Sequence, residues 1–374
     1  MKKILAMLLL VCMVLAMAAC GQQAAPAAVP AEEAAPAEEA APAEEAAPAE
    51  EAAPAEEAAP VEEAAPAEYK LGMGVALNMD SSKAGNAQVD ATVAAVVLDA
   101  EGKIVAAKLD VAQNKMDVTD GQVDPEKEFL SKVELGDDYN MVKFSSATHE
   151  WYEQAAAFEA YVIGKTADEV KGMETVVNEE GHSVTTDEEL FASCSISIAD
   201  FQEAIFKACN DEQSQSFISD GAFTLGVAVN STADESTAAT ADEEGVVNMY
   251  TDYAAAVVDS EGKIIAAVTD ATQPQIKIDA NGEIVETVFK GTKRELKEDY
   301  NMVKFSAATL EWYEQAQNFV NYVAGKTAEE LRASETVLNE EGHQVFADET
   351  LYASVSISVD GMIDVVAKAA DNAK

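Results

Sequence analysis

The sequence predicts an α+β fold: two tandem homologous domains, each an antiparallel sheet packed with helices, after a disordered Pro/Ala/Glu stalk. Three observations predict it. The second part of the chain contains an internal duplication, each copy places apolar runs around short turns before its helical segments, and the N-terminal part is a proline-rich repeat. Strands followed by helices within one copy favour helices packed on an antiparallel sheet.

The first twenty residues have the pattern of an export signal. Lys2 and Lys3 precede an apolar run over 4–16, which is shorter than the roughly 20 residues of a typical spanning helix. Small residues then precede Cys20, although Met17 stands where leucine is commoner. This segment resembles the lipobox of bacterial lipoproteins, where signal peptidase cuts before a cysteine that receives diacylglycerol. An ordinary secretory signal with a chance cysteine is the alternative.

The lipobox resemblance implies a signal peptide over 1–19, lipidation of Cys20 and a location in the cell envelope, outside the cytoplasmic membrane. Residues 20–68 would then be a lipid-anchored linker. From Pro30 to Pro66 the unit Pro-Ala-Glu-Glu-Ala-Ala places a proline at every sixth position. Proline at this spacing interrupts a helix before it can propagate. We therefore expect an extended stalk without chemistry of its own.

The rest of the chain is an internal duplication. Residues 138–155 read DYNMVKFSSATHEWYEQA and residues 299–316 read DYNMVKFSAATLEWYEQA, so sixteen of eighteen positions agree at an offset of 161. We expect repeat domains over 69–210 and 223–374, with 213–221 as the linker between them. Each is long enough to bury a core of its own.

Each copy should begin with antiparallel strands. Residues 71–77 suggest a first strand, and the apolar runs 91–98 and 104–109 flank the segment from Asp99 to Gly102. Asp at the first position and Gly at the fourth suit a type I turn, so these two runs should form a hairpin.

Helices should follow the hairpin. Apolar residues in each copy fall at i, i+4, i+7 and i+11, which is one face of a helix; they are Trp151, Ala155, Phe158 and Val162, and Trp312, Ala316, Phe319 and Val323. The segments from Thr166 and from Thr327 are capping boxes that open a next helix. Alternation over 191–198 suggests a strand, and 201–208 returns to a helical period, with Ser197 and Asp200 as a cap.

The net charge argues against one class of partner. The chain of 374 residues carries 69 acidic and 24 basic residues. Once the 13 glutamates of 21–68 and the two N-terminal lysines are set aside, 56 acidic and 22 basic residues leave a charge of −34 on 69–374. Such a surface repels phosphate backbones and anionic lipid, so we expect no nucleic-acid partner. A cationic or neutral partner and a simply solvated exterior both stay open.

No catalytic or metal motif is visible. His182 and His343 lie in Glu-Glu-Gly-His loops without further His or Cys nearby, which argues against a metal site. The triplet from Gly164 lacks the first glycine of a P-loop and suits the end of a helix. Cys194 and Cys209 have no cysteine counterparts in the second copy, and two independent buried thiols are the preferred interpretation. The sequence therefore favours a non-catalytic protein without deciding the point.

Several polar residues recur in both copies and could line a cleft. Asp110 and Gln113 recur as Asp270 and Gln273, and Lys143 and Ser145 recur as Lys304 and Ser306. They could equally cap strands and turns, and a recent duplication would keep them alike without function.

The order of elements, and a serine-rich segment before the last helix, resemble the FMN-binding domain of the RnfG/NqrC type. In that family a Ser/Thr-Gly-Ala-Thr segment holds the flavin phosphate, and its last threonine can carry FMN covalently. The corresponding stretches here contain neither Gly-Ala-Thr nor any threonine, which argues against the usual covalent linkage. The resemblance implies that FMN would contact Asp110, Gln113, Asp270 and Gln273 and the serines of these stretches, Ser193, Ser195, Ser197, Ser354, Ser356 and Ser358.

These observations favour an extracytoplasmic, membrane-anchored lipoprotein with two repeated ligand- or partner-binding modules and no catalysis. Its partners would be the membrane, through Cys20, and an unknown small molecule or cell-envelope protein. The alternative is an extracytoplasmic electron-transfer flavoprotein that binds FMN. In that case Ser193, Ser195 and Ser197 should face one pocket with Asp110 and Gln113. A hydrolase is disfavoured because no nucleophile–base pair is visible.

Overall fold

The computed structural model describes residues 65–374. The predicted signal peptide, Cys20 and nearly all of the predicted linker lie outside the described residues. Within them the fold class is confirmed, because antiparallel sheets pack against helices. We call residues 65–210 repeat 1 and residues 222–374 repeat 2.

Repeat 1 begins with three long antiparallel strands. The predicted hairpin is present, and the amide of Gly102 donates to the carbonyl of Asp99 at 3.1 Å across its turn. Both capping boxes are also confirmed, at Thr166 and at Thr327. The elements are β1 (Ala67–Asn78), β2 (Asn86–Leu98), β3 (Ile104–Asp117), α1 (Lys132–Leu135), α2 (Met141–Phe144), α3 (Trp151–Val162), α4 (Ala167–Lys171), β4 (Thr175–Val177), β5 (Ser183–Thr185), α5 (Glu188–Ser193) and α6 (Ala199–Cys209).

Repeat 2 has the same order, except that each of its two hairpin strands is interrupted and an additional strand, β12, follows them. Its elements are β7 (Phe223–Thr232), β8 (Gly245–Asn248), β9 (Tyr250–Asp259), β10 (Ile264–Thr272), β11 (Gln275–Ile278), β12 (Ile284–Val288), α7 (Lys293–Leu296), α8 (Met302–Phe305), α9 (Trp312–Val323), α10 (Ala328–Arg332), β13 (Thr336–Leu338), β14 (Gln344–Phe346), α11 (Glu349–Ser354) and α12 (Asp360–Asp371).

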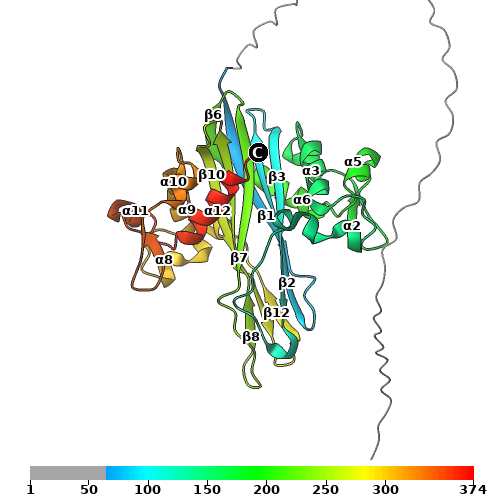
Figure 1. Ribbon diagram of the computed structural model, residues 1–374, viewed down its shortest axis with the longest axis vertical. Helices are drawn as coiled ribbons and strands as arrows, with labels where there is room; N and C mark the ends of the chain where they lie inside the picture. The colour runs from blue at the N-terminus through cyan, green and yellow to red at the C-terminus, as the bar shows by residue number, and fades with distance from the viewer. Residues whose placement is uncertain (1–64) are drawn as a thin grey trace, which may run out of the picture. The chain divides into compact units, whose positions relative to one another are not determined.

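The helices of each repeat cover the outer face of that repeat's sheet (Figure 1). A glycine on the first strand lets the last helix lie directly on the sheet. A Cβ at Gly72 would lie 2.0 Å from the carbonyl oxygen of Ala208 in α6, and one at Gly226 would lie 1.9 Å from that of Ala369 in α12. The two contacts are equivalent, so both repeats use the same close packing.

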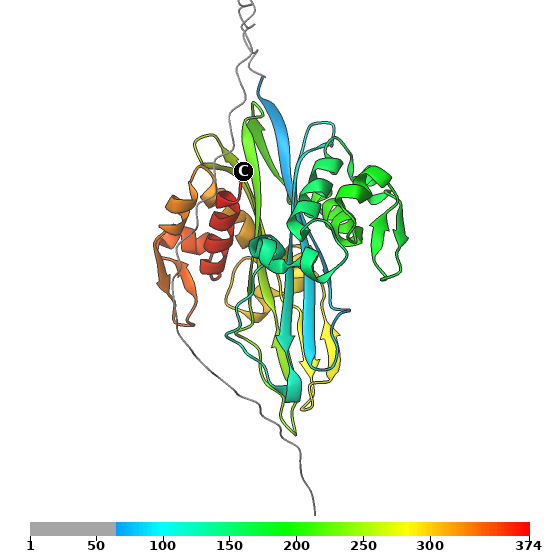
Figure 2. The ribbon, with the colours of Figure 1, turned by 45° about the vertical axis from the view of Figure 1, so that its right-hand side comes forward.

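The inner faces of the two sheets pack on each other, as the turned view also shows (Figure 2). Leu71, Val93, Val227 and Tyr253 are among the fully or almost fully buried side chains of this shared core. The two repeats are therefore halves of one compact unit, and each has only part of its core to itself.

The expected linker is part of this sheet packing. Residues Gln215–Ser219 form strand β6, which pairs with β1 and gives the sheet order β3-β2-β1-β6. Phe217 of β6 stacks on Tyr69 at 5.6 Å between ring centroids, so an apolar residue fixes the segment on the sheet. The segment 213–221 is a connection in sequence but a sheet edge in structure.

Reciprocal ion pairs join the repeats. Lys207 of α6 contacts Glu295 of α7 at 2.8 Å, and its counterpart Lys368 of α12 contacts Glu134 of α1 at 2.6 Å. In each contact, the lysine on the last helix of one repeat pairs with the glutamate on the first short helix of the other repeat. This reciprocal pairing is the pattern of a self-complementary, two-fold interface.

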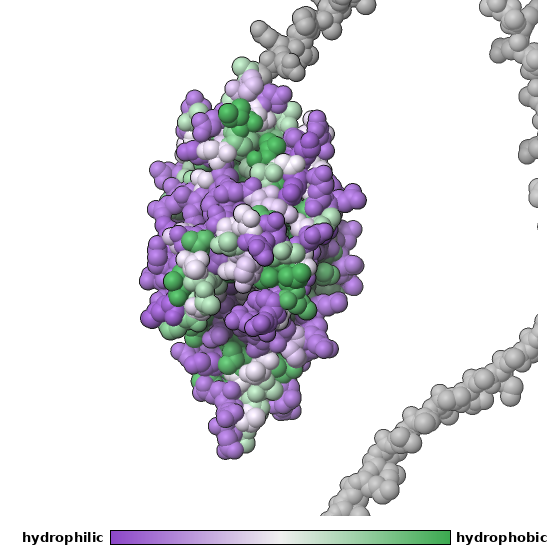
Figure 3. Space-filling model, turned by 90° about the vertical axis from the view of Figure 1, so that its left-hand side faces the viewer, coloured by the Kyte–Doolittle hydropathy of each residue, from purple (hydrophilic) through white to green (hydrophobic). Residues whose placement is uncertain are grey.

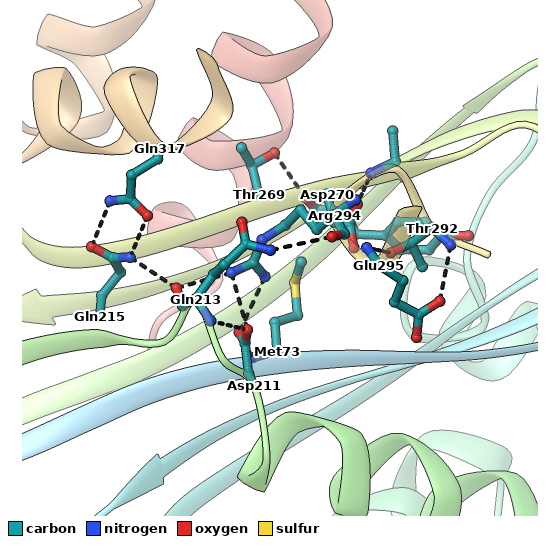
Figure 4. A network of polar contacts seen from close by, with 12 residues as sticks. Met73, Asp211, Gln213, Gln215, Thr269, Asp270, Thr292, Arg294, Glu295 and Gln317 are labelled. Atoms are coloured by element: carbon teal, nitrogen blue, oxygen red, sulfur yellow. Dashed lines mark hydrogen bonds and ion pairs between the residues drawn. The ribbon is translucent and has the colours of Figure 1, made fainter. Parts of the chain in front are cut away.

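One inter-repeat contact breaks this pseudo-symmetry. Arg294 donates to both carboxylate oxygens of Asp211 at 3.1 Å, and Met73 donates its amide to the same carboxylate (Figure 4). The side chains of the ion pair are each only 8% exposed. The equivalent positions on the other side of the interface are Val133 and Asn372.

Two local predictions were wrong. Residues 191–198, expected as a strand, form the end of α5 and a loop, because Asp187 accepts from the amides of Glu189 and Leu190 and starts a helix. The predicted cap of Ser197 with Asp200 is also absent: α6 begins after Ile198 without a side-chain cap.

Among the described residues, none of the helices has both the length and the apolar character needed to cross a membrane.

Candidate ligand cleft

Repeat 2 contains a cleft of about 770 Å³, which is within the usual range for small-molecule sites. It opens on the side of the molecule that carries the helices of repeat 2, where apolar groups interrupt a hydrophilic surface (Figure 3). Its walls come from α8 and the loop after it, the start of α9, the β13–β14 turn and the segment between α11 and α12. The lining residues are Tyr250, Lys293, Met302, Ser306, Ala307, Ala308, Thr309, Trp312, Asn339, Glu340, Glu341, His343, Tyr352, Ala353, Ser356, Ile357 and Ser358.

Lys293 lies among aromatic rings in this cleft. Its side-chain nitrogen Nζ is 4.6 Å from the ring centroid of Tyr250, 5.0 Å from that of Tyr300 and 5.4 Å from that of Trp312. It also donates to the Tyr250 hydroxyl at 3.2 Å. The residue is 7% exposed, so the rings and the hydroxyl replace much of the water that an ammonium group needs.

A buried carboxyl group accompanies this lysine. Burial raises the pKa of Asp252 to about 7, while the Lys293 ammonium and a hydrogen bond from Tyr250 act in the opposite direction. A Cβ at Gly361 would lie 2.5 Å from Oδ2 of Asp252. The start of α12 can therefore approach Asp252 only because residue 361 is a glycine.

In repeat 1, the equivalent lysine is also surrounded by aromatic rings and carboxyl groups, but the carboxyl groups come from other positions. Its lysine, Lys132, lies 5.0 Å from the ring centroid of Tyr139 and 5.3 Å from that of Trp151. The counterparts of Asp252 and Gly361 are Thr92 and Asp200, and Asp90 on strand β2 takes the position of Tyr250. Burial lowers the pKa of Lys132 to about 8, while Asp90, Asp110 and Asp200 act against that shift.

The two hydroxyl-bearing walls are held rigidly. Ser306 donates from Oγ to the carbonyl of Met302 at 2.9 Å and accepts from the amide of Ala308 at 3.1 Å. Ser356 donates from both its amide and its Oγ to Oε1 of the buried Gln315. Ser145 and Ser195 make the matching bonds in repeat 1. Both repeats therefore hold these walls in the same way.

The cleft has changed less than its scaffold since the duplication. Of the 17 lining residues, 14 have the identical residue at the matching position of repeat 1. The three exceptions are Tyr250, Ala307 and Tyr352, which match Asp90, Ser146 and Phe191. By contrast, α6 keeps only two of its eleven residues at the matching positions of α12. A recent duplication alone would not produce this contrast.

The serines singled out from the sequence have different roles in the structure. Ser356 and Ser358 line the cleft, and Ser195 and Ser197 match them in repeat 1. Ser193 and Ser354 instead donate to the carbonyls of Leu190 and Leu351, near the ends of α5 and α11.

Asp110 and Asp270 lie behind the lysines and do not line the cleft. Asp270 accepts from the amides of Ala271 and Arg294, and Asp110 accepts from the equivalent amides. Each carboxylate thus fixes the start of the short helix that begins with the lysine. Burial raises the pKa of Asp270 to about 6, although the Arg294 guanidinium lowers it. Asp270 lines a separate hollow of about 360 Å³ between the repeats.

Gln113 and Gln273 are not equivalent in their contacts. Gln113 accepts from the hydroxyl of Tyr139 at 3.3 Å, whereas Gln273 donates to Glu235 at 3.1 Å on the surface. The cleft of repeat 2 therefore brings together two of the expected serines, but neither Asp270 nor Gln273.

The sequence interpretation missed Lys132 and Lys293, and in the loop before the long helix it singled out only Ser145 and Ser306, of which Ser306 lines the cleft. That loop reads Ser-Ser-Ala-Thr over 145–148 and Ser-Ala-Ala-Thr over 306–309. The latter differs from Ser-Gly-Ala-Thr only by alanine in place of glycine. The signal that could have found it is the block of sixteen identical positions, in which both segments lie.

Two other candidate chemistries gain no support from 65–374. The described residues contain no group of three His, Cys, Asp or Glu side chains placed to hold a metal ion. Cys194 and Cys209 are free thiols, and burial raises the pKa of each to about 12, so neither is an activated nucleophile.

Comparison with known proteins gives one partial likeness. A segment of the chain is 33% identical over 117 residues to a protein named chlorophenol reductase from Desulfitobacterium hafniense. The match covers 27% of this chain and 36% of that protein, so the chain spans about a third of the relative's length. No family model and no solved structure matches the chain.

Proposed function

We propose that the protein is an extracytoplasmic, membrane-anchored lipoprotein whose repeats are non-catalytic binding modules, with the cleft of repeat 2 as one binding site. The observation that carries the proposal is the retention of 14 of the 17 lining residues between repeats whose scaffold helices α6 and α12 have diverged. Residues that only fill a core tolerate exchange for others of similar volume, as these helices show.

The composition of the cleft suits a small molecule with an aromatic part. Trp312 and Tyr352 offer ring surfaces, Ile357 and Met302 offer apolar contact, and the hydroxyl groups of the two fixed walls offer hydrogen bonds. Apolar walls with a few fixed polar groups are typical of ligand sites.

The binding proposal can be tested with the full chain and a matched pair of variants. We expect members of a panel of small aromatic compounds, FMN included, to raise the melting temperature. Ala308→Phe, which fills the cleft of repeat 2, should abolish the shift for its ligand, whereas Ala147→Phe, at the matching position of repeat 1, should leave it unchanged. A shift that survives both variants, or a panel without any shift, would contradict the proposal.

The lipid anchor is tested separately. Cys20→Ser removes the thiol that diacylglycerol would modify, so the protein should lose its lipid mass and move from the membrane fraction to the extracytoplasmic soluble fraction. Cys209→Ser serves as the control and should stay with the membrane. If Cys20→Ser also stays in the membrane fraction with unchanged mass, the anchor is not at Cys20.

A second candidate function is electron transfer by bound FMN. The segment Ser306-Ala-Ala-Thr309 on the cleft wall favours it, as does the partial likeness to a protein named a reductase. Trp312 fits a planar ring, and the Thr309 hydroxyl fits a phosphate as a donor. The hydroxyls of Ser306, Ser356 and Ser358 already donate to Met302, Gln315 and Asp360, and Glu340 and Glu341 in the lining oppose a phosphate. FMN would supply one- and two-electron transfer when bound.

The test of this candidate is a visible absorbance spectrum of the full chain, produced in a host that supplies flavin and a flavin transferase. Flavin bands that leave the protein on acid precipitation would indicate non-covalent FMN, and bands that stay with added mass would indicate covalent attachment. A colourless protein of unmodified mass would reject the candidate and leave the binding proposal intact.

A further inference from the structure

Lys293 is a buried cation that uses little of its hydrogen-bonding capacity. Its side chain is 7% exposed. Within residues 65–374, its Nζ makes one hydrogen bond, to the Tyr250 hydroxyl at 3.2 Å, and joins none of the ion pairs. The rings of Tyr250, Tyr300 and Trp312 attract the charge but offer no lone pair to an N–H group. An ammonium group has three donors, so two of them have no acceptor among the described residues.

This lysine borders a cavity that a ligand can enter. Lys293 lines the cleft of about 770 Å³ together with two of the three rings near its Nζ, those of Tyr250 and Trp312. Apolar side chains, among them Met302 and Ile357, form other parts of the lining. A ligand in the cleft therefore meets a buried cation beside aromatic and apolar walls.

The charge of Lys293 is only partly neutralised by the protein. Asp252 acts on this ammonium without forming an ion pair with it, and burial raises the pKa of Asp252 to about 7, so much of this carboxyl is protonated near neutral pH. Glu340 and Glu341 also line the cleft, but they are exposed on the β13–β14 turn, where water screens their charge. The buried cation therefore favours a ligand that brings one negative charge.

A carboxylate meets these requirements better than other acceptors. Its two oxygens accept from an ammonium group, and a hydrogen bond between charged partners is stronger than one between neutral partners. A phosphate would bring a second negative charge towards Glu340 and Glu341, and the hydroxyls of Ser306 and Ser356 already donate to other groups of the protein. A neutral carbonyl or phenol would leave the ammonium without a counterion.

We propose that the cleft of repeat 2 binds an aromatic carboxylate. The carboxylate group of the ligand accepts from Nζ of Lys293, and its ring lies against the apolar and aromatic walls that include Trp312. This inference rests on the proposed function, since it takes the same cleft as the binding site, and it names the chemical class of the ligand.

The protein contains only two tryptophans, and this makes the test specific to one cleft. In the full chain with Trp151→Phe, only Trp312 reports, excited at the red edge of its absorption where phenyl rings do not absorb. The probes are phenylacetate, 3-phenylpropionate and 4-phenylbutyrate at about pH 7. We expect at least one acid to give a saturable change in emission. Its primary amide has the same shape without the charge and should bind at least about tenfold more weakly, which is the effect of one charged hydrogen bond.

Variants of the lysine and its acid test the proposed contact. Lys293→Met keeps an unbranched apolar stem without the ammonium, so the acid should bind no more tightly than the amide, while amide binding shows that the cleft is intact. Lys132→Met, at the matching position of repeat 1, is the control and should keep the preference for the acid. Asp252→Asn covers the case in which Lys293→Met fails to fold: it removes the competing carboxyl and should tighten binding of the acid but not of the amide.

Three results would overturn the inference. They are an amide that binds as tightly as its acid, a preference for the acid that persists in Lys293→Met, and the absence of a saturable change with all three acids. The proposed function would still stand if a neutral aromatic compound stabilised the protein and Ala308→Phe removed that stabilisation. The two failures are therefore distinguishable.

Discussion

At the scale of single residues, the two repeats place acidic side chains near equivalent lysines from different elements, with Lys293 buried and Lys132 half-buried. In repeat 2 the acid is Asp252 on a strand, and Gly361 leaves room for it; in repeat 1 Thr92 and Asp200 take these positions. A buried ammonium without a nearby carboxylate would be strongly destabilising. Different elements can therefore supply the carboxyl group, but one must remain near the lysine.

This exchange predicts a double-mutant result. Gly361→Asp should lower the free energy of unfolding by about 3 kcal/mol, because its side chain collides with the Asp252 carboxyl group. The double variant Asp252→Thr/Gly361→Asp copies repeat 1 and should return to within about 1 kcal/mol of wild type. Urea unfolding of the three proteins measures this, and a double variant as unstable as the sum of its single variants would refute the equivalence.

The buried acids also predict how stability depends on pH. Burial raises the pKa of Asp252 to about 7, of Glu159 to about 7 and of Asp270 to about 6. An unfolded carboxyl titrates near 4. Between about pH 4 and pH 7 the folded state therefore binds more protons, and stability falls as the pH rises through this window.

The melting temperature should accordingly be higher at about pH 5 than at about pH 7.5. Asp252→Asn should reduce this difference, whereas Glu101→Gln, on an exposed turn, should not. A melting temperature that is constant or falls on acidification over this range would show that burial of these groups does not control stability.

At the scale of secondary-structure elements, a local signal explains most of what the sequence predicted. The hairpin, the helix with Trp151 and the capping boxes all follow from neighbouring residues, and the structure contains each of them. The prediction for segment 191–198 failed because Asp187 starts a helix that runs to Ser193, and the alternating serines that follow lie in the loop between α5 and α6.

The cleft was predictable only in part, because some of its residues are far apart in the sequence and meet only in the folded structure. Ser356 and Ser358 belong to a visible motif, but Lys293 and Tyr250 are 43 residues apart and meet only through the packing of α7 on the sheet. Nothing local distinguishes Lys293 from a surface lysine. The pairing of β6 with β1 is equally non-local. Segment 213–221 is polar and lies between two repeats, so its sequence predicts a linker.

The contact between the first strand and the last helix gives a prediction at this scale. Gly226→Ala places a methyl group 1.9 Å from the carbonyl oxygen of Ala369, which is backbone and cannot swing away. We expect a loss of about 3 kcal/mol in unfolding free energy. Gly164→Ala has open space and only a left-handed backbone to strain, so it should cost about 1 kcal/mol. Equal effects would show that α12 can shift off the strand.

At the scale of the whole molecule, the repeats behave as two subunits joined into one chain. The reciprocal pairs of Lys207 with Glu295 and of Lys368 with Glu134 have the symmetry of a homodimer interface, and the sheets bury a common core. The ion pair of Arg294 with Asp211 has no symmetric copy, so it distinguishes one side of the interface from the other.

That asymmetric pair gives the last prediction. Arg294→Val leaves the Asp211 carboxylate buried with the amides of Met73 and Gln213 as donors but without a cation, and should cost about 3–5 kcal/mol. The double variant Arg294→Val/Asp211→Asn reproduces the Val133 and Asn372 found on the opposite side, and should recover most of this loss, because no buried charge is left unpaired. Chemical unfolding monitored by Trp151 and Trp312 separately shows whether the halves still unfold together. If the double variant is no more stable than Arg294→Val, the ion pair holds the repeats together in a way that the neutral pair on the other side does not.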